Sequence, residues 1–345
     1  MVDMSRRRGP GPPDGDDHVD TTNRKGRALM NIDVHAHYWT DSYLDRIQAL
    51  GKDDTDTQRG MGAGDGKELQ DRRELMDRSG VDLQILSAAP QMPYSDTDRD
   101  GAVEAARFVN DQYAELVKEY PDRFRAFVAL PMPHIEESLA ELARGLDELG
   151  FLGVVFNTTI NGRPLVDPEF APIFEELNRR KAVVYIHPAG NSVDTPLIRD
   201  HHMTWMVGAP MEDTVSIMQL ITEGFPTKYP DITFINSHLG GALPMLLQRA
   251  DNQVGWEAPD TPEKPSEAAR RMYFDSVGHG HVPAIRAAVD SFGADRILLG
   301  TDFPYEAGDI FTRAVEYIPE GLDEKDATAV LSGNAARLFP SLADK

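Results

Sequence analysis

Short apolar segments rich in β-branched residues alternate along this chain with longer segments of helical periodicity. Apolar runs of this kind predict strands that are buried on both faces, which is typical of parallel sheets. Eight strands are predicted: Ile32–His35, Val81–Ser87, Arg125–Leu130, Leu152–Asn157, Ala182–His187, Ile232–Ser237, Met272–Ser276 and Arg296–Thr301.

The intervening segments place apolar residues at helical spacing. The predicted helices are Gly66–Ser79, Ala102–Tyr120, Ile135–Leu149, Glu169–Lys181, Glu212–Gly224, Ala242–Ala250, Pro283–Phe292, Glu324–Leu331 and Ala335–Phe339. Strands that alternate with helices in this way predict an α/β fold, a single (β/α)₈ TIM barrel. Long loops follow strand 1 (38–65) and strand 5 (190–211), on the barrel face where active sites lie.

Composition narrows the protein class. The formal net charge of −22 argues against nucleic acid and anionic membranes as partners, and no apolar run is long enough to span a bilayer. The absence of cysteine excludes disulfides and thiolate sites. Residues 1–29 lack periodicity and are predicted to be a disordered arm before a barrel domain at 30–345. Because no apolar signal segment follows the N-terminal arginines, we expect a cytoplasmic protein.

Metal-type side chains fall at the ends of four predicted strands. His35 and His37 end strand 1 on one face, His187 ends strand 5, His238 follows strand 6 and Asp302 follows strand 8. Each alone is also compatible with a structural core histidine or a helix cap. Their shared placement at the carboxyl ends of strands instead predicts a metal site with acid/base groups at the barrel mouth.

These segments resemble a known family. His-x-His after strand 1, His-Pro after strand 5, Ser-His-x-Gly-Gly after strand 6 and Gly-Thr-Asp-Phe-Pro after strand 8 are similar to the amidohydrolase superfamily. Within it, they resemble the branch of aminocarboxymuconate semialdehyde decarboxylase and related nonoxidative decarboxylases, over about residues 31–339. The resemblance implies that His35, His37, His187 and Asp302 bind one divalent metal and that His238 is the acid/base residue.

The metal is expected to be zinc. Strand 4 ends in Val-Phe-Asn-Thr, without the lysine that bridges two metals in binuclear relatives, so a mononuclear site is favoured. Some aromatic-acid decarboxylases of this branch begin Glu-x-His and tend to use manganese, whereas this chain begins His-Ala-His. Three imidazoles and one carboxylate suit zinc, and manganese remains an alternative.

The resemblance also indicates substrate-binding residues. An arginine at the spacing of Arg249 reaches the neighbouring subunit's pocket and binds a substrate carboxylate, which implies a homodimer or higher oligomer; the alternative is a surface arginine paired with Asp251. Arg59 is a second candidate, in the loop after strand 1. Aromatic and apolar side chains expected to form the pocket wall are Tyr38, Trp39, Trp205 and Met206.

The expected activity is metal-dependent, nonoxidative decarboxylation of an unsaturated or aromatic carboxylic acid. His238 would move a proton and Arg249 would orient the acid. The alternative is hydrolysis of an amide, lactone or related bond, with Asp302 as the proton shuttle. A noncatalytic metal-binding protein is a third possibility. Release of CO₂ separates the first activity from the second, and loss of activity on chelation separates both from the third.

Overall fold

The computed structural model describes residues 29–52, 55–61, 66–191 and 193–343. The arm predicted for residues 1–29 lies, except for its last residue, outside these described residues. No described helix is both long and apolar enough to cross a membrane.

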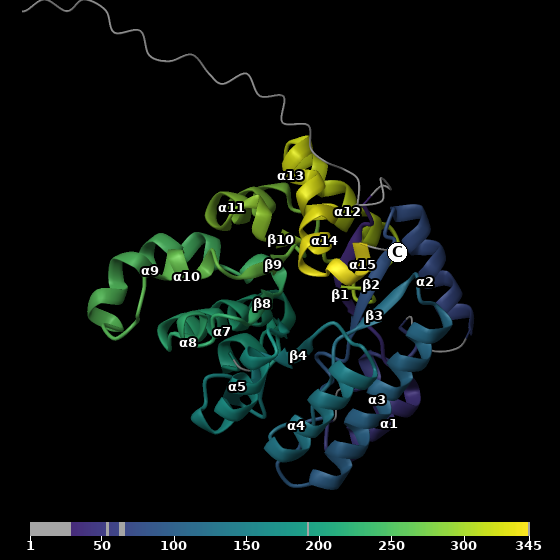
Figure 1. Ribbon diagram of the computed structural model, residues 1–345. Coiled ribbons are helices and arrows are strands. Elements are labelled where there is room, and N and C mark those ends of the chain that lie inside the picture. Colours follow the sequence, from purple (N-terminus) through teal and green to yellow (C-terminus); the bar gives the residue numbers. More distant parts are fainter. Residues whose placement is uncertain (1–28, 53–54, 62–65, 192, 344–345) are drawn as a thin grey trace, which may run out of the picture.

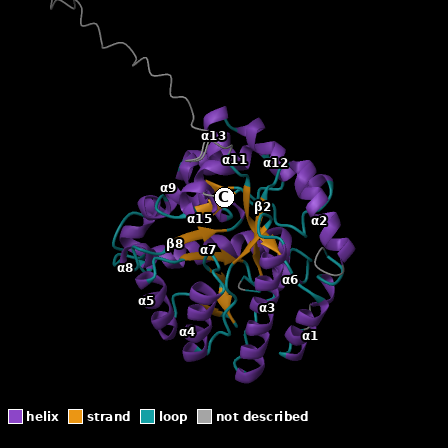
Figure 2. Ribbon diagram, turned by 45° about the vertical axis from the view of Figure 1, so that its right-hand side comes forward, coloured by secondary structure: helices purple, strands orange, loops and turns teal. Residues whose placement is uncertain are grey.

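Parallel strands form the centre of the molecule (Figures 1 and 2). They pair in the ladders β1-β2-β3 and β4-β7-β8-β9-β10. Their bounds are Ile32–His37 (β1), Leu83–Ser87 (β2), Phe124–Ala126 (β3), Val154–Asn157 (β4), Val183–His187 (β7), Thr233–Asn236 (β8), Tyr273–Asp275 (β9) and Ile297–Leu298 (β10). Each predicted strand therefore exists, and most are shorter than predicted.

Backbone hydrogen bonds join the two ladders at both of their edges. Between β3 and β4, the Val128 amide donates to the Gly153 carbonyl at 2.8 Å. Between β1 and β10, the Val34 amide donates to the Leu299 carbonyl at 2.9 Å. These contacts close the strands into a barrel, which confirms the predicted fold. Gly153, just before β4, is required by the close approach of β7, because a Cβ there would lie 2.4 Å from the Val183 carbonyl oxygen.

Helices surround the strands on the outside (Figure 2). The main ones are α2 (Gly66–Ser79), α3 (Arg99–Glu119), α4 (Ile135–Ala143), α5 (Ala171–Arg179), α7 (Ala209–Thr222), α9 (Leu243–Glu257), α11 (Val282–Phe292) and α12 (Asp309–Gly321). The C-terminal segment adds α13 (Glu324–Thr328), α14 (Asn334–Leu338) and α15 (Pro340–Ala343).

The predicted elements omit several that the structure contains. The loop after β1 holds α1 (Asp41–Ala49), whose N-terminus is capped by the Thr40 side chain accepting from the Tyr43 amide. The loop after β7 holds α6 (Pro196–Arg199), and a hairpin of β5 (Thr159–Ile160) and β6 (Arg163–Pro164) follows β4. Smaller helices α8 (Phe225–Lys228) and α10 (Pro265–Ala269) flank α9.

The largest omission is α12, although its buried positions Phe311, Ala314, Val315 and Ile318 recur at helical spacing. Pro319 interrupts the pattern, but it lies in the last turn. A proline there ends a helix without preventing the turns before it.

A buried polar network ties β1 to β2 and α2 below the site. Arg72 is almost fully buried; its Nε donates to Gln84 Oε1 and its guanidinium also donates to the His37 carbonyl, both at 2.8 Å. Gln84 Nε2 donates in turn to Asp33 Oδ2 at 2.8 Å. Asp33 also accepts from the Thr301 hydroxyl, and burial raises its pKa to about 6 against these lowering hydrogen bonds.

We expect Arg72→Ala to lower the free energy of unfolding by about 3–5 kcal/mol, because it leaves buried polar groups without their partner. Arg78→Ala, an exposed arginine on the same helix, is the matched control and should change stability by less than about 0.5 kcal/mol. Urea denaturation followed by circular dichroism measures both. Equal effects of the two substitutions would show that the network contributes nothing specific.

Candidate metal centre and active site

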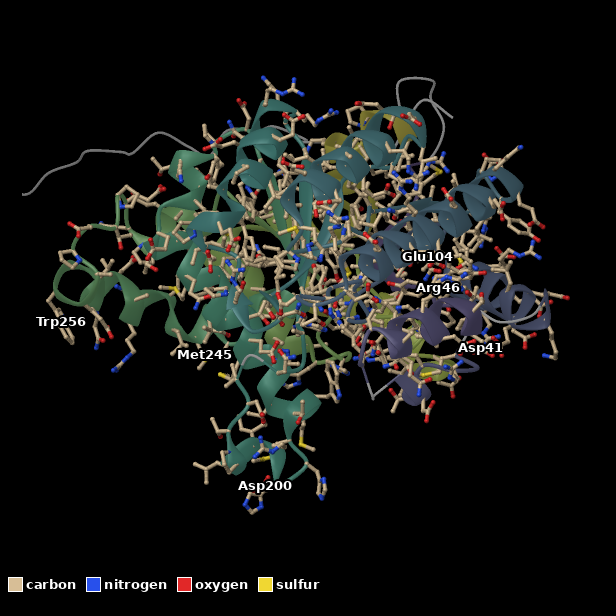
Figure 3. All side chains as sticks on the ribbon, turned by 90° about the horizontal axis from the view of Figure 1, so that it is seen from below. Asp41, Arg46, Glu104, Asp200, Met245 and Trp256 are labelled. Atoms are coloured by element: carbon tan, nitrogen blue, oxygen red, sulfur yellow. The ribbon has the colours of Figure 1, made fainter. Side chains whose placement is uncertain are left out.

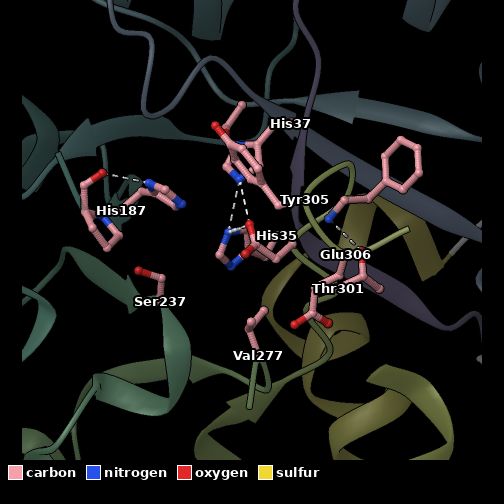
Figure 4. Close-up of polar contacts among 12 residues, drawn as sticks. His35, His37, His187, Ser237, Val277, Thr301, Tyr305 and Glu306 are labelled. Carbon is pink, nitrogen blue, oxygen red and sulfur yellow. Dashed lines mark hydrogen bonds and ion pairs between the residues drawn. The ribbon is translucent and has the colours of Figure 1, made fainter. Parts of the chain in front are cut away.

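Four side chains from three parts of the barrel wall meet at its carboxyl end. His35 and His37 lie at the end of β1, His187 ends β7 and Asp302 follows β10. The Nε2 atoms of His35 and His37 are 3.2 Å apart, and each lies 3.1 Å from Asp302 Oδ1. The ring of His187 is 5.0 Å from that of His35 and 4.8 Å from that of His37, between centroids. Figure 4 shows the three imidazoles around one centre.

The hydrogen-bond partners of these imidazoles are those of metal ligands. Each ring has a separate contact for Nδ1, which leaves Nε2 for the centre. The Nδ1 partners of His35, His37 and His187 are Asp275 Oδ2 (2.7 Å), Ser87 Oγ (3.0 Å) and the Pro188 carbonyl (2.9 Å). Outer contacts of this kind fix the orientation of a histidine ligand. Three nitrogen donors and one carboxylate, all buried, are a ligand set that fits a single divalent metal.

His238 lies beside this centre and has a different set of contacts. Its Nε2 is 3.8 Å from Asp302 Oδ2, farther than the 3.1 Å between His37 and Asp302 Oδ1. Its Nδ1 lies 2.9 Å from Asp213 Oδ2, and Asp213 also accepts from the Ser237 hydroxyl at 2.9 Å. His238 is near enough to share a cluster with His35, His187 and Asp302, whose ligand atoms lie within 4.8 Å of one another. Its Nδ1 contact resembles that of His35, and its longer distance from Asp302 is what sets it apart from His35 and His37.

Burial and charge act in opposite directions on His238. Burial lowers its pKa, but the neighbouring carboxylates of Asp213 and Asp302 outweigh burial and hold the pKa well above its usual range. Burial raises the pKa of Asp213 to about 6, against the lowering effect of His238. At neutral pH the imidazolium form of His238 is therefore favoured, and this form can donate a proton.

The pKa shifts of the other histidines differ in direction, because burial prevails at two of them and carboxylates prevail at the third. Burial lowers the pKa of His37 to about 4 and that of His187 well below its usual value. Neutral imidazoles of this kind are ready to bind a metal. At His35, burial is outweighed by Asp275 and Asp302, and the pKa rises to about 9. A bound cation would replace the proton there.

The backbone is strained where the functional side chains enter the site. His238, Leu239 and Asp302 have φ angles of 52°, 55° and 59°, in the left-handed region that residues other than glycine rarely adopt. Gly300 is also required, because a Cβ there would lie 3.0 Å from the Cβ of His35. The turn after β10 thus approaches β1 closely enough to bring Asp302 to the histidines.

A cavity of about 790 Å³ opens above the cluster, and His187, His238 and Asp302 form part of its wall. Its lining is mainly apolar. The ring of Tyr305 lies 6.5 Å from that of Trp205 at an angle of 27°, and 5.7 Å from that of His37. Cavities of this size with an aromatic wall accept small planar molecules.

Of the aromatic and apolar residues predicted to form the pocket wall, some line the cavity and others do not. Trp205 lines the cavity and is half exposed. Trp39 is buried behind the metal centre, stacked on His37 at 5.2 Å with its indole donating to the Ala88 carbonyl. Met206 is exposed next to Trp205 but does not line the cavity.

Tyr38 and Arg59 do not reach the cavity. Tyr38 points into the core, where its ring lies 6.1 Å from that of Tyr113. The guanidinium of Arg59 forms ion pairs with the carboxylates of Asp41, Asp45 and Asp56 on α1 and the turn after it. These pairs anchor the loop after β1, and Arg59 is not among the residues that line the cavity, so its predicted contact with a substrate has no support in this geometry.

Arg249 is exposed on α9 and does not line the cavity of its own chain. The alternative of an ion pair with Asp251 is wrong, because Asp251 accepts from the amide and hydroxyl of Ser266. In the described part of the chain, no side chain binds the Arg249 guanidinium.

The sequence reasoning missed Asp275, Asp213 and Tyr305. Asp275 ends β9 in Phe-Asp-Ser, so its position at a strand end was the available signal. Asp213 lies in the first turns of α7, where acidic residues are common, and Tyr305 lies in a loop. Their importance depends on contacts between distant segments.

Comparison with known proteins agrees with this geometry. The model of the amidohydrolase family matches residues 32–341. The 2-amino-3-carboxymuconate-6-semialdehyde decarboxylase of Dictyostelium discoideum is 32% identical over 76% of this chain and 74% of that protein. The gamma-resorcylate decarboxylase of Polaromonas sp. is 31% identical over 79% of this chain and 87% of that protein.

Solved structures show the same fold. The 5-carboxyvanillate decarboxylase LigW of Sphingomonas paucimobilis superposes with a TM-score of 0.80 and 25% identity, over 91% of this chain and 99% of that chain. A dihydroxybenzoic acid decarboxylase of Polaromonas sp., with bound manganese and the inhibitor 2-nitroresorcinol, superposes with a TM-score of 0.77 and 29% identity, over 90% and 97%.

The predicted resemblance is therefore confirmed at the level of the family, and these relatives are all decarboxylases. With a closed barrel, a histidine and aspartate cluster at its carboxyl end and a family match over residues 32–341, this chain belongs to the amidohydrolase family.

Proposed function

We propose that this protein is a metal-dependent, nonoxidative decarboxylase of aromatic or unsaturated carboxylic acids. The observation that carries the proposal is the His238–Asp213 pair beside the metal centre, at the floor of a cavity with an aromatic wall. This arrangement supplies a proton donor next to a site for a planar acid. The similarity to decarboxylases of gamma-resorcylate and 5-carboxyvanillate supports the same reaction class.

His35, His37, His187 and Asp302 would hold the metal. When bound, the cation supplies positive charge that orients and polarises the substrate. The His-Ala-His sequence and the three imidazole donors favour zinc. Manganese, which is bound in the Polaromonas structure, is the alternative.

His238 would deliver the proton of the reaction. The ring or diene carbon that carries the carboxylate accepts the proton from Nε2 and becomes tetrahedral. The bond to the carboxylate then breaks, its electron pair returns to the unsaturated system, and CO₂ leaves. Asp213 holds the imidazole through Nδ1 and stabilises its protonated form. Asp302, whose pKa is held well below its usual range by His35 and the other histidines despite burial, stays an anion beside it.

The substrate-binding residues would come from two copies of the chain. Trp205 contributes to the cavity wall within one copy, and Arg249 would bind the carboxylate in the site of a second copy. Exposed apolar side chains support an interface near the cavity: Leu197, Met206 and Val207 on the segment after β7, and Met245, Leu246 and Trp256 on α9. Figure 3 shows the segment around Asp200 standing out from the body, with Met245 and Trp256 labelled on α9.

We expect the purified protein to contain one zinc ion per chain and to release CO₂ from at least one member of a panel of hydroxybenzoic and dienoic acids. Chelation should abolish the release and zinc should restore it better than manganese. Metal analysis and a coupled CO₂ assay measure these quantities. Better recovery with manganese would contradict the metal assignment, and hydrolysis of amides or lactones without CO₂ release would contradict the function.

His238→Asn should lower kcat at least about 100-fold while the metal content stays unchanged, because only the proton donor is lost.

Asp213→Asn should lower the pKa of His238. As pH rises, the imidazolium form and the activity should therefore be lost at a lower pH than in the wild type. Replacement of the exposed His202 by Asn is the control. Wild-type kcat in His238→Asn would exclude the proposed proton donor.

Arg249→Ala and His238→Asn should each be inactive alone, but a mixture that is unfolded and reassembled together should regain activity. A hybrid dimer contains one site with both an intact His238 and the partner subunit's Arg249. Analytical ultracentrifugation measures whether the wild type and the reassembled mixture are dimers. Failure of the mixture to regain activity, with hybrid dimers present, would show that Arg249 does not act across subunits.

A further inference from the structure

The cavity has a second histidine and carboxylate pair, on the side formed by the loops after β9 and β10. His279 lines the cavity with its side chain largely exposed, and its Nδ1 lies 2.5 Å from Glu306 Oε1. Glu306 is only 3% exposed, and neither of its carboxylate oxygens has a hydrogen bond of good geometry within the described residues. The decarboxylation mechanism above uses neither residue.

A buried carboxylate without hydrogen bonds is costly unless a cation lies beside it. In the described part of the chain, His279 is the only cationic side chain in ion-pair contact with Glu306. The contact with Glu306 raises the pKa of His279, against the lowering effect of partial burial. The pair therefore favours the protonated imidazole, whose Nδ1 faces Glu306 while Nε2 is available to a ligand at the cavity wall.

The backbone holds His279 in this position at some cost. Its φ angle of 49° is unfavourable for a residue with a side chain. Gly278 packs so closely that a Cβ there would lie 2.8 Å from Leu239 and 3.1 Å from the Tyr317 hydroxyl. On the other side, the Arg313 guanidinium donates to the Gly280 carbonyl at 3.2 Å. A strained, tightly packed loop that holds an imidazole at a cavity wall is typical of a functional position.

The cavity needs such a donor. Among the described residues that line it, the titratable groups are Asp302, four histidines and Tyr305, and no lysine or arginine is present. A carboxylic acid entering this space approaches the negative charge of Asp302. Arg249 lies outside the cavity of its own chain, and His238 is engaged with Asp213 beside the metal centre, so His279 is a further imidazole that the same chain offers to an acid.

We propose that His279, held by Glu306, binds the carboxylate of the substrate through a charge-assisted hydrogen bond from Nε2. The proposal rests on the proposed function for the class of substrate, an aromatic or unsaturated acid. Glu306 is a positioning residue in it, since it acts through His279. This assigns acid recognition to a residue of the chain that also holds the metal, in addition to any contribution from a second copy.

The test uses direct binding to the zinc-loaded protein, with salicylate and gamma-resorcylate as acids and phenol and resorcinol as their counterparts without the carboxylate. His279→Leu should weaken binding of the acids at least about tenfold, the range of a lost charge-assisted hydrogen bond, and change binding of the phenols less than about twofold. His279→Gln, which keeps a donor, should recover part of the loss. His281→Gln is the matched control, because His281 also lines the cavity and has no carboxylate partner among the residues that the structure describes.

The role of Glu306 is tested by pH. Groups that face His279 are Glu306 and Asp302 from the segment after β10 and His238 after β8, with His281 on its own loop. In the wild type, affinity for the acids should fall as pH rises through the raised pKa of His279, and Glu306→Gln should move this fall to lower pH. Glu306→Gln should not lower the melting temperature, because it removes a buried charge.

Equal weakening of acids and phenols by His279→Leu, an unchanged pH dependence in Glu306→Gln, or no binding of either acid by the wild type would overturn the proposal. A different combination separates the two proposals. If the variants bind the acids more weakly but the wild type releases no CO₂, the role of His279 in acid binding is supported and the decarboxylase function is contradicted.

Discussion

The site depends on one junction of the backbone, where the last strand of the barrel meets the first. The Asp302 amide donates to the His35 carbonyl at 2.9 Å, and the His37 amide donates to the Phe303 carbonyl at 2.7 Å. These bonds align the turn after β10 with the end of β1, so that a carboxylate from one end of the chain meets two imidazoles from the other. The small size of Gly300 and the left-handed backbone of Asp302 permit this approach.

Carboxylates outside the centre then determine what each imidazole does. Asp275 contacts His35 through one oxygen and accepts from the His238 amide through the other, so a single buried side chain orients both groups. Tyr185 also donates to Asp275, from the barrel interior. At His35 and His238 the neighbouring carboxylates outweigh burial and raise the pKa, whereas at His37 and His187 burial prevails and lowers it. The same residue type thus serves as metal ligand and as proton donor within a few ångströms.

The cavity also contains histidines that are held by buried carboxylates. Its floor carries the metal centre and the His238–Asp213 pair, and its side carries His279 over the buried Glu306. In each pair, a histidine that lines the cavity contacts a carboxylate that is buried. A protein with a net charge of −22 can thereby present positive groups to an acid without using a lysine or arginine of the same cavity.

The sequence by itself determined the barrel and the composition of its centre. Alternating strand and helix patterns specify a parallel barrel, and a barrel places the ends of its strands together, so His35, His37, His187, His238 and Asp302 could be grouped before any coordinates. This prediction succeeds because it needs only periodicity and strand ends, which are local properties of the chain.

Tertiary structure decided which other side chains share that centre. Asp213 lies in a helix and Glu306 in a loop, and only packing brings them to His238 and His279. Packing likewise directs Tyr38 into the core and Arg59 to a group of carboxylates, although both lie in the segment between β1 and α2, on the side of the barrel where the cavity opens. The direction of a side chain from a loop is set by its long-range contacts, and these leave no periodic pattern in the sequence.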